Sequence, residues 1–351
     1  MEVQEEVVMK DSKAYFRGCL LGGAIGDALG YPVEFMDLQE IMGTYGNEGI
    51  RDLQINEASG NALISDDTQM TVFTVDGLVW ADKKAKTKGI YAYVPCVFYA
   101  YQKWYYTQTG HFADNKYEFL SDGEVFHWEE LFARRTPGET ILEALAGSIR
   151  GKFGSIKNRI NNSKGYGAVV RSAPIGLYFF REPEKAFRIG CEVAALTHGH
   201  SDAFLSAGYL SCLMAFVIQG LSLEDAVQRA LSLLKEEKNS ETVQGALEKA
   251  LGLATEKEDP KKALPRLGEG WVAEEALAMA VFCALRYPEN YGDAVVAAAN
   301  QDGNSNGAAA ICGSILGAYL GSLEIPYEWI RQVELSDLMV HGADKLLEAV
   351  K

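Results

Sequence analysis

The hydrophobic residues of this chain recur mainly every three or four positions, the spacing that places them on one face of an α-helix. In residues 14–30 this spacing continues until Pro32, which predicts the end of a helix. Ser65 predicts the start of a second helix, with Asp66 and Asp67 in its first turn. Further helical patterns cover residues 142–149, 186–196, 241–254, 272–285 and 294–299, and another helix opens at Ser222. The predicted fold class is all-α.

Two segments qualify this pattern. Residues 203–221 carry no charge and are almost long enough to span a bilayer. Their serines and Gln219, together with the lack of a basic flank, favour a helix buried among other helices, so no membrane is expected. Residues 91–106 are rich in aromatic residues and valine, and both strand and helix fit them.

Three long segments are polar and interrupted by glycine or proline, which makes them candidates for functional loops: 110–124, 151–167 and 256–270. No repeat or linker divides the chain. We therefore expect one domain over residues 1–351, in which residues 1–10 form a loose N-terminus.

Composition and charge narrow the class of protein. The chain is 48% hydrophobic and 23% charged, which is ordinary for a packed globular protein. Its net charge of −15 would repel a phosphate backbone, so nucleic acid is not expected as a partner. The six cysteines show no metal-ligand spacing, and the acidic N-terminus does not resemble a secretory signal. The cytoplasm is the expected compartment.

The strongest chemical signal is the sequence Ser65-Asp66-Asp67-Thr68. A helix cap needs only one hydroxyl or carboxylate, so capping does not explain all four of these residues. Two adjacent carboxylates between hydroxyls favour a site for a hard cation such as Mg²⁺. Asp27 and Glu34 lie seven residues apart around Pro32 and would reach the same cleft, although either also fits a solvated surface acid.

Three further segments are weaker candidates. Residues 163–167 form a glycine-interrupted loop whose backbone N–H groups would suit phosphate oxygens. His198 and His200 flank a glycine before the uncharged helix, where either a ligand or a helix cap explains them. Residues 300–307 read as a polar loop that initiates a helix.

Taken together, five segments resemble the ADP-ribosylglycohydrolase family in order and content, over nearly the whole chain. The resemblance is to the group of dinitrogen reductase activating glycohydrolase and the ADP-ribosylarginine and ADP-ribosylserine hydrolases. The segments are GCLLGGAIGDALGYPVEF (18–35), ISDDTQMTVFTVDGL (64–78), SKGYGAVVRSAPIGL (163–177), THGHSDAFLSAGYL (197–210) and GWVAEEALAMAVFCAL (270–285).

The resemblance implies one orthogonal multi-helix domain with two Mg²⁺ or Mn²⁺ ions, which cleaves the bond at C1 of the distal ribose of ADP-ribose. It implies metal ligands at Ser65, Asp66 and Asp67. It implies catalytic roles for Glu34, Asp66 and Asp67. Substrate contacts are expected at Gly26, Asp27, Ser163, Gly165, Tyr166, Gly167, His198 and Gln301.

The chain departs from the family where the second set of metal ligands is expected. The family's Gly-Asp-x-Asp-Ser/Thr stretch falls on Gly303, Asn304, Ser305, Asn306 and Gly307. An amide oxygen can bind a hard cation but brings no negative charge, so we expect at most one ion. Restoring Asp, Asp and Ser at positions 304, 306 and 307 is expected to tighten metal binding.

Two functions follow from these residues. One is a glycohydrolase with an impaired metal site, acting on an ADP-ribosylated protein or small molecule. The alternative is a weak or inactive pseudoenzyme that binds ADP-ribose, an ADP-ribosylated protein or a toxin partner. The resemblance favours the enzyme and the missing carboxylates oppose it.

Overall fold

A computed structural model describes residues 8–351 of the chain, and it is 67% helical. Within this range there is no β-strand, only three isolated bridges. The all-α prediction is therefore confirmed. The loose N-terminus expected over residues 1–10 lies largely outside the described residues. Lys10, at its end, is held by the fold, because its backbone N–H donates to the carbonyl of Ile218 at 2.8 Å.

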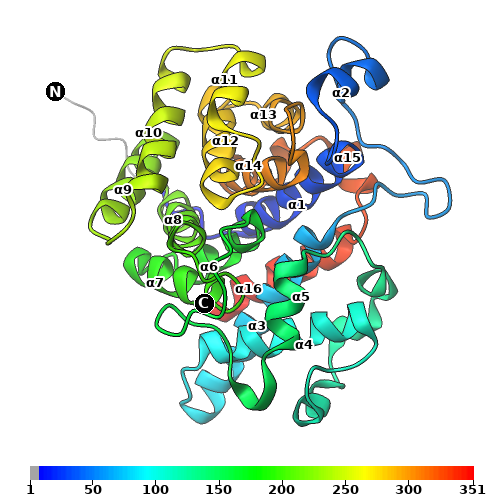
Figure 1. Cartoon of the computed structure of the whole chain (residues 1–351), viewed down its shortest axis with the longest axis vertical. Helices are drawn as coiled ribbons and strands as arrows, with labels where there is room; N and C mark the ends of the chain where they lie inside the picture. Colours follow the sequence, from blue (N-terminus) through cyan, green and yellow to red (C-terminus); the bar gives the residue numbers. More distant parts are fainter. Residues whose placement is uncertain (1–7) are drawn as a thin grey trace.

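Two helices cross at the centre of the molecule, α1 (Lys13–Gly30) and α14 (Ser305–Leu320) (Figure 1). Three glycines of α1 face the α14 backbone. A Cβ atom on each would lie 2.0 to 2.3 Å from a backbone oxygen, in the pairs Gly18 with Gly317, Gly22 with Gly313 and Gly26 with Ala309. No side chain fits in that space. The close approach of the two helices therefore explains why glycines occur within the helical pattern of residues 14–30.

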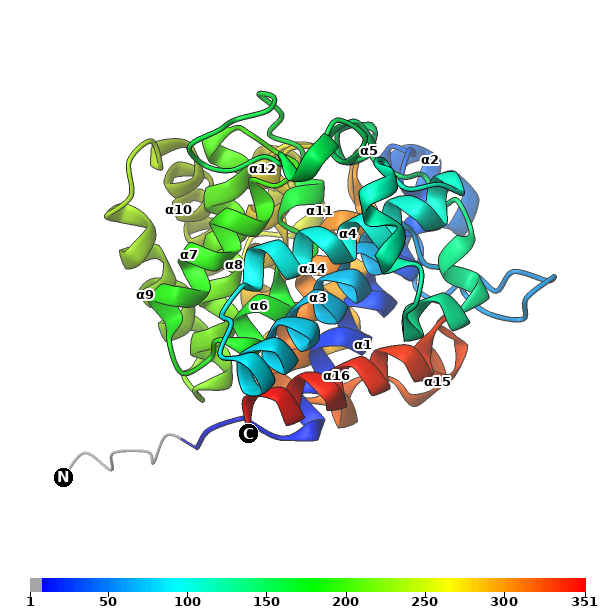
Figure 2. The ribbon, with the colours of Figure 1, turned by 90° about the horizontal axis from the view of Figure 1, so that it is seen from below.

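Helices from both halves of the chain surround α1. The C-terminal helix α16 (Ser336–Val350) runs along it, and α3 (Asp66–Lys88) packs beside both (Figure 2). Arg17 of α1 pairs with Asp344 of α16 at 2.7 Å. Next to α3 lies α4 (Tyr93–Thr109), so the aromatic segment that fitted both strand and helix is a helix.

The uncharged segment forms α8 (Ser201–Ile218), which is 94% buried. By length and composition it is the one helix in residues 8–351 able to cross a membrane. Its burial confirms the predicted interior helix. Its neighbours are α6 (Ala173–Tyr178), α7 (Pro183–Ala194), α9 (Leu223–Lys235) and α12 (Ala273–Arg286).

The remaining helices cover this core. They are α2 (Leu38–Tyr45), α5 (Glu139–Ala146), α10 (Glu241–Thr255), α11 (Pro260–Leu267), α13 (Tyr291–Ala299) and α15 (Tyr327–Gln332). Short 3₁₀ turns include Tyr31–Val33, Asn115–Leu120, Glu124–His127, Glu129–Phe132, Ile149–Gly151, Tyr166–Ala168 and Ser322–Glu324.

One predicted loop needs correction. Residues 256–270 contain α11, which Asp259 caps by accepting a hydrogen bond from the backbone N–H of Lys261. Proline at the first helical position is compatible with a helix, because that N–H would have no intrahelical partner. Pro265 lies inside the same short helix, which is why its sequence resembles a loop.

Candidate functional site

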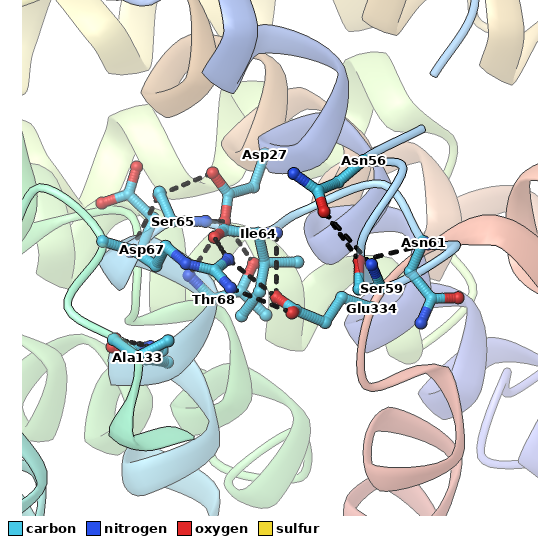
Figure 3. A network of polar contacts seen from close by, with 12 residues as sticks. Asp27, Asn56, Ser59, Asn61, Ile64, Ser65, Asp67, Thr68, Ala133 and Glu334 are labelled. Carbon is cyan, nitrogen blue, oxygen red and sulfur yellow. Dashed lines mark hydrogen bonds and ion pairs between the residues drawn. The ribbon is translucent and has the colours of Figure 1, made fainter. Parts of the chain in front are cut away.

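Asp27 fixes the start of α3. Its side chain is fully buried and its two oxygens accept four hydrogen bonds (Figure 3). The backbone N–H and hydroxyl of Ser65 donate at 2.9 and 2.6 Å, and those of Thr68 at 3.2 and 2.6 Å. The sequence predicts Gly26 and Asp27 as substrate contacts. The structure places both against protein atoms, where Gly26 packs on Ala309 and Asp27 positions the helix.

The other side of this turn is held by a segment that sequence reasoning missed. Arg135 donates to the carbonyl of Ile64 at 3.2 Å and pairs with the buried Glu334 at 3.0 Å. The backbone N–H of Asp66 donates to the carbonyl of Arg135 at 3.1 Å. The turn that carries the two aspartates is therefore fixed from both sides. No local pattern marks Arg135 or Glu334 in the sequence.

Three carboxylates converge at this turn. Glu34, Asp66 and Asp67 are each exposed by 4% or less. Thr136 donates to Glu34 Oε2 at 3.4 Å, and the backbone N–H of Gly138 donates to Asp66 Oδ2 at 3.1 Å. The three residues predicted as catalytic therefore share one buried environment.

Burial sets the acidity of this cluster, and the neighbouring negative charges add to its effect. Desolvation, with the charge of Asp27, raises the pKa of Glu34 to about 7. Desolvation, with Asp27 and Glu34 nearby, raises the pKa of Asp66 to about 8. The pKa of Asp67 is raised well above its usual range by burial and then by Asp66. Such a cluster favours either protons or a bound cation.

Residues 303–307, here called the amide segment, contact the first set of predicted metal ligands, Ser65, Asp66 and Asp67. The side-chain nitrogen of Asn306 donates to Ser65 Oγ at 3.2 Å and to Asp67 Oδ2 at 3.3 Å. Asn304 caps α14, because its Oδ1 accepts the backbone N–H of Gly307 at 2.8 Å. The resemblance implies two sets of metal ligands at one site, and the structure places the two segments in contact.

Tyr166 occupies the space beside Gly307. A Cβ atom on Gly307 would lie 2.6 Å from two ring carbons of Tyr166 and 2.3 Å from Asn304 Oδ1. Burial raises the pKa of the Tyr166 hydroxyl well above its usual value, and the charges of Asp67, Asp66 and Glu34 act in the same direction. The tyrosine ring therefore lies between the loop at 163–167 and the carboxylates.

His198 lies under the same loop and is buried. Its Nδ1 lies 2.8 Å from Thr197 Oγ1, and its Nε2 would lie 3.3 Å from a Cβ atom on Gly165. Arg171 donates to Thr197 Oγ1 at 2.5 Å. His200 instead caps α8 by accepting the backbone N–H of Asp202, so the two histidines have different roles.

The segment at 269–272 joins the loops around the site, and sequence reasoning missed this function. The backbone N–H of Tyr166 donates to the carbonyl of Trp271 at 3.2 Å, and that of Asn304 donates to Glu269 at 2.8 Å. Trp271 also stacks on the exposed ring of Phe35, with centroids 5.7 Å apart. Extended main-chain pairing of this kind leaves no periodic signal in the sequence.

Gly165 and Gln301 are also predicted substrate contacts, and they differ in whether protein atoms already satisfy their polar groups. The N–H of Gly165 donates to Ser163 Oγ at 3.4 Å, so with Tyr166 two amides of the expected phosphate nest already have protein partners. Gln301 is buried, and within residues 8–351 neither its amide nitrogen nor its amide oxygen has a partner. Buried amides without partners are rare, which makes Gln301 the stronger candidate for a ligand contact.

Comparison with known proteins identifies one family. Residues 9–351 match the ADP-ribosylglycohydrolase family. The chain belongs to this family. The family assignment thus covers nearly all of the residues that the structure describes.

Several relatives of this ADP-ribosylglycohydrolase family member are distant. An uncharacterized protein of Archaeoglobus fulgidus is 25% identical, over 95% of this chain and 96% of its own length. ADP-ribosylarginine hydrolase Tri1 of Serratia proteamaculans is 24% identical, over 94% of this chain and 78% of its length. Tri1 of Pseudomonas putida is 22% identical, over 95% and 77%.

A solved structure supports the fold. A chain of an ADP-ribosylglycohydrolase-related protein complex aligns with a TM-score of 0.60 at 20% sequence identity. The alignment covers 98% of this chain and all of the other. The family's all-helical fold is therefore shared over the full length of both.

The family is generally metal-dependent, which raises the question of whether these residues suit two ions. Within residues 8–351, no three His, Cys, Asp or Glu side chains form a ready-made metal centre. Asp66 and Asp67, with Glu34 nearby, provide hard oxygens and excess negative charge, which fits one ion that keeps several waters.

The other half of the site does not fit a second ion. Ser65 Oγ donates to Asp27 and accepts from the backbone of Asp67 and from Asn306, so its hydrogen-bonding capacity is filled. Asn306 presents an N–H group to Asp67, and its amide oxygen, which has no partner in the described part of the chain, brings no negative charge to hold a second ion. Gly307 provides no side chain at all.

Proposed function

We propose that this protein is a hydrolase that releases ADP-ribose by cleaving the bond at C1 of the distal ribose, with at most one Mg²⁺ or Mn²⁺ ion. The observation that carries the proposal is the convergence of Glu34, Asp66 and Asp67 in one buried cluster. His198 and Tyr166 lie at the adjoining loop and supply the substrate side. The substrate is an ADP-ribosylated protein or small molecule.

The residues divide the chemistry between them. Asp66 and Asp67 would hold the ion, which when bound polarises water and orients ribose hydroxyls. Glu34, with its pKa raised to about 7, can accept a proton from water and return it near neutral pH. Gln301 has buried amide atoms free to hydrogen-bond a polar ligand.

Arginine is the first acceptor to test. Two relatives carry the name ADP-ribosylarginine hydrolase, and both align with at least 94% of this chain. The acidic surroundings of the cluster would also favour a guanidinium leaving group on electrostatic grounds. We therefore propose the N-glycosidic bond to arginine, with the serine O-glycosidic bond as the comparison.

The second candidate is a protein that binds ADP-ribose, an ADP-ribosylated protein or a toxin without turnover. It is favoured by the contact between Asn306 and Asp67, because an N–H group there already satisfies a carboxylate oxygen. We propose the cytoplasm for either function, and the six buried, unpaired cysteines support a reducing compartment.

Calorimetry and a turnover assay separate the two candidates. ADP-ribose is titrated with and without Mg²⁺, and ADP-ribosylated arginine and serine peptides are then assayed for release. Glu34→Gln should lower turnover roughly 100-fold or more while ADP-ribose still binds. Glu48→Gln is the matched control, because Glu48 is 74% exposed in an ion pair with Arg51. Binding without release by the unmodified protein would favour the pseudoenzyme.

A further inference from the structure

We infer that Tyr166 is a steric barrier to a second ion at this site, in addition to the missing carboxylates. The inference rests on the proposed one-ion function and assigns part of the cause to a side chain outside the amide segment. The ring of Tyr166 lies where a side chain at position 307 would stand, 2.6 Å from its Cβ position. A serine or threonine at this position therefore conflicts with the ring before any metal is considered.

The ring cannot easily move aside. Two of the three conflicting atoms are the ring carbons Cδ2 and Cε2, and the third is Asn304 Oδ1 at 2.3 Å, the end of a more flexible side chain. The backbone of Tyr166 is fixed on both sides, because its N–H donates to Trp271 and its carbonyl accepts from Val169 at 2.8 Å. The flanking Gly165 and Gly167 lie against His198 and Ile141, so the loop also has little room to shift.

Two groups of the protein occupy the role that a second ion would have beside Asp67: a neutral amide and a permanently charged guanidinium. The N–H group of Asn306 satisfies Ser65 and Asp67, and the buried guanidinium of Arg171 provides a fixed positive charge that acts on Asp67. The site is thus built around the absence of a second cation. Restoring Asp, Asp and Ser at positions 304, 306 and 307 alone would add negative charge but leave the ring in place.

The test counts Mn²⁺ ions by calorimetry and by electron paramagnetic resonance, where two neighbouring Mn²⁺ ions give a spin-coupled spectrum. Four proteins are compared: wild type, the triple variant N304D/N306D/G307S, Tyr166→Ala, and the quadruple variant that combines them. We expect one ion at most in the first three. The quadruple variant should bind one more ion than the triple variant and show the coupled signal.

Tyr178→Ala in the triple background is the matched control, because Tyr178 is a half-buried tyrosine of α6 whose hydroxyl contacts Asp82. It should leave the ion count of the triple variant unchanged. An additional ion in the triple variant itself, or none in a folded quadruple variant, would overturn the inference. Two ions in wild type would overturn both the inference and the one-ion part of the proposed function.

A measurement without metal covers the case in which the quadruple variant does not fold. Gly307→Ser, Tyr166→Ala and the double variant are compared by thermal unfolding in chelator. Gly307→Ser should lower the melting temperature in the wild-type background and lower it much less beside Tyr166→Ala. Equal losses in the two backgrounds would show that the ring does not block position 307.

Discussion

His198 is held in one protonation form by its neighbours. Arg171 donates to Thr197 Oγ1, so the hydroxyl hydrogen of Thr197 has two acceptors in reach, His198 Nδ1 at 2.8 Å and the carbonyl of Ala194 at 3.5 Å, and the shorter contact favours His198. Nε2 then carries the ring hydrogen on the side of Gly165. Burial, and then the charge of Arg171, lowers the pKa of His198 to about 3. The site thus presents a neutral N–H donor, suited to a phosphate or ribose oxygen.

This arrangement predicts the effect of Thr197→Val. Without the hydroxyl, Nδ1 has no donor and the tautomer balance should shift toward Nδ1–H. Loss of one hydrogen bond, worth about 1 kcal/mol, should weaken ADP-ribose binding roughly fivefold. Nitrogen-15 NMR of labelled histidine reports the tautomer, and calorimetry reports affinity.

Thr107→Val is the control for this change, because Thr107 is also buried but hydrogen-bonds the carbonyl of Trp104 in α4. It should change neither the His198 spectrum nor the affinity. A hydrogen on Nδ1 of His198 in the wild-type protein would contradict the proposed hydrogen-bond order.

Asp27 should matter for stability more than any exposed aspartate. Asp27→Ala leaves buried donors of Ser65 and Thr68 without an acceptor, so the free energy of unfolding should fall by about 3 kcal/mol. Asp37→Ala removes the exposed cap of α2 and should lower it by about 1 kcal/mol. Urea unfolding compares the two. Equal losses would mean that Asp27 is not the anchor of α3.

At the scale of elements, the crossing of α1 and α14 positions the site. α1 carries Asp27, while α14 begins at the amide segment, so the distance between the two helices sets the distance between their side chains. Tyr291 of α13 adds to this contact by donating to the carbonyl of Gly22 at 2.7 Å. Any increase in the distance between the two helices should therefore displace the predicted metal ligands.

Gly22→Ala should widen the crossing, because the added Cβ would lie 2.3 Å from the carbonyl oxygen of Gly313. We expect a loss of about 1–3 kcal/mol in unfolding free energy, together with weaker Mn²⁺ binding. Gly245→Ala in α10 meets no atom within 4 Å and should stabilise the protein by about 1 kcal/mol. Thermal melts check both signs. A stabilising Gly22→Ala would show that the helices have room to spare.

Sequence patterns predicted the elements whose signals are local. Ser65 at the start of α3 and the uncharged helix α8 were both expected, because caps and burial leave marks within a few residues. The match of Asn306 to Ser65 came from resemblance to a family. The ring of Tyr166 over Gly307 was not predicted, because a contact between distant loops depends on packing that no local pattern encodes.

The whole molecule should respond to pH through its buried carboxylates. Glu34 and Asp66 have pKa values raised to about 7 and about 8, above their unfolded values of 4.5 and 3.8. Between pH of about 4 and 8 the folded protein therefore binds more protons than the unfolded chain. The free energy of unfolding should decrease as the pH rises through this range. Melting temperatures in chelator should reveal this loss.

A divalent ion should counter that loss, because it binds the deprotonated carboxylates. Mg²⁺ should therefore raise the melting temperature more at the alkaline end of this range than at the acidic end. Asp66→Asn should reduce both the pH dependence in chelator and the effect of Mg²⁺. The same Mg²⁺ effect at both ends would argue against binding at this cluster.

The central crossing also has a consequence for how the chain reaches its fold. Gly22 and its partner Tyr291 are 269 positions apart, and α14 follows later still. At a synthesis rate of about 5–20 residues per second, α1 would wait roughly 15–60 s on the ribosome for the helix that covers it. During that interval its glycine-lined apolar face has no partner. The nascent chain is thus expected to expose this face until its last quarter emerges, and the loss of late segments would leave its first helix uncovered.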